Sequence, residues 1–120
     1  MPIAVLHKSQ YESNKNLLSS SQLFKQKKFI DWYITISFYS AVHLVEGYLD
    51  KYKSINSENH KDRLKTIKQD SFMGPLFLDF NYLYNESIRA RYKCSNFDED
   101  SIDNINKALE KIENKLKILI

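Results

Sequence analysis

The segment 31–50 constrains the fold more than any other part of the sequence, because it is apolar on most sides when it is drawn as a helix. At 3.6 residues per turn its large side chains fall on two faces, with Ile34, Phe38, Ala41, Val42, Val45 and Leu49 on the first and Trp32, Ile36, Tyr39 and His43 on the second. Such a helix needs neighbours on more than one side. We therefore predict an all-α fold in which this segment is the central helix of a bundle.

Further helices are expected on both sides of it in the chain. Hydrophobic residues seven apart predict a first helix from about Leu6 to Lys28. After the central helix, Asn56 or Ser57 is the expected N-cap of a short helix that ends near Gln69. Pro75 fits the first turn of a fourth helix, where its missing N–H is harmless. One stripe of that helix is formed by Leu76, Phe80, Leu83 and Ser87.

The last helix has the most regular pattern, over residues 102–119. Its apolar residues alternate steps of three and four: Ile102, Ile105, Leu109, Ile112, Leu116 and Leu119. Acidic residues gather before and at its start and lysines at its end, which complements the helix dipole. A helix of this kind docks on a bundle or pairs with its own copy. The whole pattern predicts an up-and-down bundle of four to five helices in a single domain, residues 1–120.

Composition agrees with a single helical core. The 120 residues are 42% hydrophobic and 28% charged, with only two Gly and two Pro to build hairpins. The single cysteine, Cys94, cannot form an internal disulfide, so we expect a cytoplasmic protein. The segment 31–50 approaches the length of a membrane span, but Ser37, Ser40, His43 and Glu46 within it favour a core helix, and we expect no membrane contact. The net charge of +3 is mild for a nucleic-acid-binding protein.

Metal and cofactor binding have little support in the sequence. The three histidines and the cysteine, at positions 7, 43, 60 and 94, show no ligand spacing such as Cys-x-x-Cys. Two distant glycines cannot form a Gly-rich phosphate loop. We therefore expect neither a metal nor a cofactor.

Histidine chemistry is the main candidate for function. His43 lies one turn after Tyr39 and one turn before Glu46, so its imidazole is oriented either as a general base or as a hydrogen-bonded core residue. His60 and Arg63 share one side of the short helix, where they would suit a phosphate, unless Arg63 pairs with a nearby acid. If the helices pack around the central one, a single cationic, aromatic pocket would hold Tyr39, His43, His60, Arg63, Arg91 and Tyr92.

Four short motifs, in this order, resemble small bacterial members of the HEPN superfamily over most of the chain. They are Asp31-Trp32, Phe38-Tyr39-Ser40-Ala41-Val42-His43, Asn59-His60-x-x-Arg63 and Ser87-x-x-Ala90-Arg91-Tyr92. The resemblance implies a bundle of four or five helices, frequent homodimerisation, and a place among toxin–antitoxin, phage-defence and RNA-processing proteins. Many relatives are metal-independent ribonucleases, whereas others are non-catalytic modules that bind nucleotide, RNA or a protein partner.

The sequence departs from the catalytic pattern of that superfamily, an Arg followed four to six residues later by a His. All three arginines, Arg63, Arg89 and Arg91, follow the last histidine, His60. We therefore expect a non-catalytic or degenerate domain that binds RNA, a nucleotide phosphate or a protein partner. One alternative is a metal-independent ribonuclease with a relocated site, in which His60 or His43 is the acid–base group and Arg63 or Arg91 stabilises the phosphorane. Another is a homodimeric or antitoxin-like interaction protein that uses the apolar face of residues 102–119.

Overall fold

The computed structural model describes residues 3–20, 26, 29–93 and 96–120. Within them lie five α-helices and no β-strand: α1 (Ala4–Ser20), α2 (Ile30–Tyr48), α3 (His60–Gln69), α4 (Phe77–Tyr92) and α5 (Glu99–Leu116). A π-helical turn, η3 (Leu49–Lys53), extends α2, and two short 3₁₀ turns, η4 (Gly74–Leu76) and η5 (Lys117–Leu119), precede α4 and follow α5. The predicted all-α fold is confirmed.

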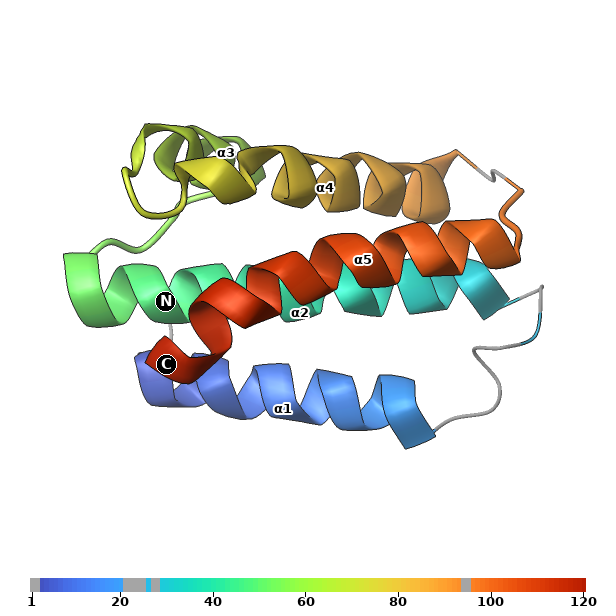
Figure 1. Cartoon of the computed structure of the whole chain (residues 1–120), viewed down its shortest axis with the longest axis horizontal. Helices are drawn as coiled ribbons and strands as arrows, with labels where there is room; N and C mark the ends of the chain where they lie inside the picture. Colours follow the sequence, from blue (N-terminus) through green and yellow to red (C-terminus); the bar gives the residue numbers. More distant parts are fainter. Residues whose placement is uncertain (1–2, 21–25, 27–28, 94–95) are drawn as a thin grey trace.

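The four long helices α1, α2, α4 and α5 lie along the long axis of the molecule and alternate in direction (Figure 1). Helix α2 is the central element, because it packs against α1, α4 and α5. The short helix α3 contacts α4 and η4 at one end of the bundle. The start of α1 and the end of η5 lie at that same end (Figure 1). This arrangement is the up-and-down bundle that the sequence predicts.

The core forms where the predicted apolar stripes meet. From α2, Ile34, Phe38 and Leu44 have no exposed surface. The stripe of α4 is buried as expected, at Leu76, Phe80, Leu83 and Ser87. The face of α5 is buried at Ile105, Leu109, Ile112 and Leu116. This α5 face packs inside the bundle, and the dimer predicted on it stays a prediction.

Two helix starts show how local capping sets the boundaries. Asp98 begins α5 with a capping box, in which its side chain accepts the N–H of Ser101 and the Ser101 side chain accepts the N–H of Asp98. The cap of α3 is Asn59, whose side chain accepts the N–H of Asp62 at 2.8 Å. The expected caps, Asn56 and Ser57, are therefore wrong, and residues 54–59 are not helical.

Some expectations fall on residues that the structure does not describe. The described part of α1 ends at Ser20, so the predicted continuation of this helix towards Lys28 lies outside the described residues. Cys94 also lies outside them. The part of the chain that is described contains no helix long and apolar enough to cross a membrane.

Candidate functional site

A buried ion pair joins α2 to α3. Arg63 Nε lies 2.6 Å from Glu46 Oε1, and the two side chains are 5% and 0% exposed. The other carboxylate oxygen of Glu46 accepts the backbone N–H of Ser57 at 3.4 Å. The sequence left open whether Arg63 binds a phosphate or pairs with an acid, and the structure pairs its guanidinium with Glu46. Arg63 is therefore placed to hold α3 against α2.

The same guanidinium fixes the protonation of His60. Arg63 Nη1 donates to His60 Nδ1 at 2.7 Å, and since a guanidinium only donates, this nitrogen must carry a lone pair. Burial lowers the pKa of His60 below its ordinary value, and the charges of Arg63 and Arg91 lower it further. His60 is therefore neutral, with its proton on Nε2. In this state Nδ1 is already occupied and Nε2 can only donate, so the ring cannot act as an acid–base group unless the bond to Arg63 breaks.

Arg91, near the end of α4, is held by neutral groups alone. Its Nε donates to the Ser87 carbonyl at 3.2 Å and its Nη2 donates to the Ser87 hydroxyl at 3.3 Å. Its Nη1 donates to the hydroxyls of Tyr39 at 3.1 Å and Tyr92 at 3.4 Å. Among the described residues no carboxylate forms an ion pair with it. Its positive charge is therefore fixed in place but not neutralised.

Aromatic rings surround this guanidinium. The Arg91 Cζ lies 5.6 Å from the ring centroid of Tyr39, 5.0 Å from that of Tyr92 and 6.0 Å from that of Phe38. The ring centroid of His60 lies 6.1 Å from that of Tyr39 and 5.4 Å from that of Phe38. Tyr39, His60, Arg91 and Tyr92 thus form one cluster, which we call the Arg91 site. Four of the six residues of the predicted pocket meet in it, with Arg63 directly behind His60.

His43, the remaining predicted residue, is engaged on the side of α2 that faces α1. Its Nδ1 lies 2.9 Å from Nδ1 of His7, so one of these nitrogens donates and the other accepts. Burial lowers the pKa of His43, and His7 and Arg63 lower it further, although Glu46 acts in the opposite direction. His7 is a residue that the sequence analysis missed. Its spacing of four from Tyr11, which is also buried on α1, was the available signal.

No protein family, curated protein or solved structure matches this chain.

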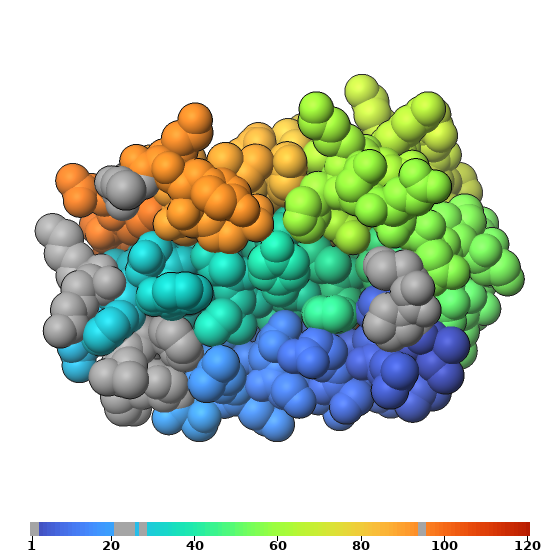
Figure 2. Space-filling view, turned by 180° about the vertical axis from the view of Figure 1, so that it is seen from behind, coloured from blue at the N-terminus to red at the C-terminus, as the bar shows by residue number. Residues whose placement is uncertain are grey.

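A small cavity of about 130 Å³ adjoins the Arg91 site, between the start of α2 and the end of α4. It is lined by Asp31, Trp32, Thr35, Ala90 and Arg91. Figure 2 shows this face of the molecule, where the first residues of α2 lie beside the last residues of α4. Two aromatic side chains are unusually exposed here, Trp32 at 58% and Tyr92 at 69%. The cation is therefore flanked by exposed aromatic surface.

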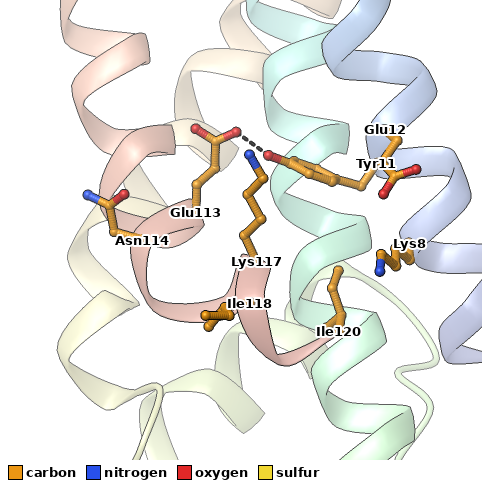
Figure 3. A pocket seen from close by; sticks show the side chains of 8 residues that line it. All are labelled: Lys8, Tyr11, Glu12, Glu113, Asn114, Lys117, Ile118 and Ile120. Atoms are coloured by element: carbon orange, nitrogen blue, oxygen red, sulfur yellow. Dashed lines mark hydrogen bonds between the residues drawn. The ribbon is translucent and has the colours of Figure 1, made fainter.

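A larger pocket of about 460 Å³ lies elsewhere, between α1 and the C-terminal end of α5 (Figure 3). Tyr11 donates to Glu113, which also pairs with Lys15 Nζ at 3.2 Å. Lysine and glutamate side chains balance one another around the rim, at Lys8, Glu12, Glu113 and Lys117.

No group of three or more His, Cys, Asp and Glu side chains is arranged to hold a metal ion in the described parts of the chain. The chemistry that the Arg91 site offers consists of a fixed guanidinium, a neutral imidazole N–H and aromatic faces. Groups of these kinds are suited to hydrogen-bonding an anion and to stacking on planar rings.

Proposed function

We propose that this protein is a non-catalytic, HEPN-like module that binds single-stranded RNA through the Arg91 site. The observation that carries the proposal is the guanidinium of Arg91, which neutral acceptors orient and no described carboxylate neutralises. A prepositioned guanidinium forms charge-assisted hydrogen bonds with phosphate oxygens at little entropic cost. His60 Nε2–H supplies a second, uncharged donor close to it.

Exposed aromatic rings favour RNA over a simple phosphate. Proteins bind unpaired bases by stacking them on aromatic side chains beside a basic backbone-binding groove. Trp32, which lines the cavity with Arg91, and Tyr92, whose ring lies 5.0 Å from the Arg91 Cζ, are both exposed and offer such faces. The side chains of Lys61 and Lys65 are exposed on α3, the helix that carries His60. A duplex would not present its bases to these rings, so we assign single-stranded RNA.

The ribonuclease alternative has less support. With Arg63 bonded to Nδ1 and a proton on Nε2, His60 has no lone pair for a substrate hydroxyl and no second proton for a leaving group. Arg63 is neutralised by Glu46, which makes it a poor stabiliser of a phosphorane. His43 is bonded to His7 on the other side of α2. These contacts support binding without cleavage.

The biological system in which we place this protein is proposed from the HEPN resemblance alone. We include in the proposal a role in a cytoplasmic toxin–antitoxin or phage-defence system, with a protein partner or a second copy of the chain. In this proposal either partner uses a surface other than the apolar face of α5, because that face is buried.

A pair of arginines on one helix provides the test. Arg91→Gln removes the proposed phosphate contact, and Arg89→Gln is the matched control because Arg89 is exposed and paired with Glu86 at 2.6 Å. Fluorescence anisotropy with a labelled single-stranded RNA should show about tenfold weaker binding for Arg91→Gln, as loss of one charge-assisted contact predicts. Arg89→Gln should bind within about twofold of the unmodified protein. Equal losses in both variants, or no binding by the unmodified protein, would overturn the proposal.

A further inference from the structure

We propose that the cavity beside Arg91 holds one base of the bound RNA and that it selects guanine. This inference rests on the proposed RNA binding and adds a specificity to it. The cavity, lined by Asp31, Trp32, Thr35, Ala90 and Arg91, combines a carboxylate, a guanidinium and an exposed indole within about 130 Å³. Each of these three groups matches a different part of a nucleobase.

The carboxylate of Asp31 is the acceptor in this cavity. Its Oδ1 accepts the backbone N–H of Trp32 at 2.9 Å, which orients the group in the first turn of α2. No lysine, arginine or histidine of the described residues forms an ion pair with it. A carboxylate offers about four lone-pair positions, so most remain for a ligand. A base in the cavity therefore gains by presenting N–H groups to Asp31.

Arg91 supplies the positive charge on the α4 side. Ser87, Tyr39 and Tyr92 occupy all but one of its N–H groups, and the remaining N–H is the one that we assign to the RNA phosphate. The charge itself favours a base edge that carries acceptors. Trp32, 58% exposed, supplies a face on which the ring can stack. The cavity thus favours a base with donors on one edge and acceptors on another.

Guanine is the base that fits this description. Its N1–H and 2-amino group are adjacent donors that can meet the two oxygens of one carboxylate, and its O6 and N7 are both acceptors. Adenine places the bare N1 acceptor where guanine has N1–H, so it would face the carboxylate with a lone pair. Uracil has one N–H between two carbonyls. Guanine alone therefore satisfies Asp31 with two donors.

The test uses short labelled oligouridines that differ only at the central base, which is guanine, adenine, hypoxanthine or uracil. In anisotropy titrations the guanine oligonucleotide should bind about tenfold more tightly than the adenine and uracil ones, the discrimination expected of one two-point base contact. Hypoxanthine lacks the 2-amino group and should bind with intermediate affinity. Equal affinity for all four oligonucleotides would overturn guanine selection and leave the proposed RNA binding intact, whereas failure to bind any of them would overturn both.

The Asp31→Asn substitution tests base recognition without disturbing the fold. The amide oxygen can still accept the N–H of Trp32, so the start of α2 is kept, but the side chain now offers one acceptor and one donor. We expect the guanine preference over adenine to fall to about twofold or less, while affinity for plain oligouridine stays within about twofold. Thermal unfolding followed by circular dichroism checks that the variant is folded. A folded Asp31→Asn variant that keeps the full guanine preference would contradict the assignment.

Discussion

Arg63 Nε lies 2.6 Å from Glu46 Oε1, and both side chains are buried between α2 and α3. The same guanidinium donates to His60 Nδ1. A contact made in the core thus determines the protonation state of a half-buried ring at the Arg91 site. For the function that we propose, this link is the reason to expect that RNA is bound and not cleaved.

The first prediction concerns the stability of this ion pair. Glu46→Gln leaves the Arg63 charge buried without its counterion, which typically costs about 3–5 kcal/mol. The double variant Glu46→Gln/Arg63→Met removes both charges and should recover most of the loss. Urea unfolding gives the free energies. Glu86→Gln is the control, because its partner Arg89 is exposed and such pairs contribute about 0–1 kcal/mol. Similar losses for Glu46→Gln and Glu86→Gln would contradict the account.

The second prediction concerns pH. Burial, aided by nearby positive charges, lowers the pKa of both His43 and His60 below the ordinary value of 6.5. Above that value both rings are neutral in the folded and unfolded chain, so they add no pH dependence. As the pH falls below it, the unfolded chain takes up protons first, so the free energy of unfolding decreases.

Variants without these rings test the sign of the effect. Between about pH 6.5 and pH 5, His43→Gln and His60→Gln should each lose stability less steeply than the unmodified protein, as measured by urea unfolding at several pH values. A steeper loss in either variant would mean that the corresponding ring is stabilised in its charged form, contrary to the contacts observed.

The third prediction concerns the contact between α1 and α5. Tyr11 is 2% exposed and donates its hydroxyl to Glu113, and burial together with this bond raises the pKa of Tyr11. Tyr11→Phe should lower the free energy of unfolding by about 1–2 kcal/mol, because a hydrogen bond to a charged group is lost. Tyr33→Phe, which removes a more exposed bond to Asn106, should cost less. A larger loss of unfolding free energy for Tyr33→Phe than for Tyr11→Phe would contradict the buried contact between Tyr11 of α1 and Glu113 of α5.

The fourth prediction concerns cleavage. Labelled single-stranded RNA incubated with the protein in EDTA should stay intact, because His60 is held as a neutral donor. Denaturing gel electrophoresis gives the measurement, with His60→Ala and Arg63→Ala as companions. Cleavage by the unmodified protein that disappears in His60→Ala would contradict the binding assignment and favour a relocated ribonuclease site.

Elements with a strong hydrophobic period could be predicted from the sequence. The steps of three and four between Ile105 and Leu116 place one face of α5 in the core, and the structure buries that face. The stripe through Phe80 and Leu83 is buried for the same reason. Periodicity reports burial directly, so it locates helices and core faces well.

Partners across helices could not be predicted in the same way. Glu46 was read as a neighbour of His43 on α2, yet it pairs with Arg63 of α3, while His43 pairs with His7 of α1. Several Asn and Ser residues could cap α3, and the structure has Asn59 as the cap. Such choices depend on how helices approach in space, which a one-dimensional pattern does not contain.

The side-chain Nε–H resonances of the three arginines offer the most direct test of RNA binding at the Arg91 site. In a ¹⁵N-labelled sample titrated with unlabelled single-stranded RNA, we predict that the Arg91 resonance shifts or broadens. The resonances of Arg63, buried against Glu46, and Arg89, paired with Glu86, should stay in place. An Arg91 resonance that does not move at saturating RNA, or one that moves no more than that of Arg89, would contradict the account.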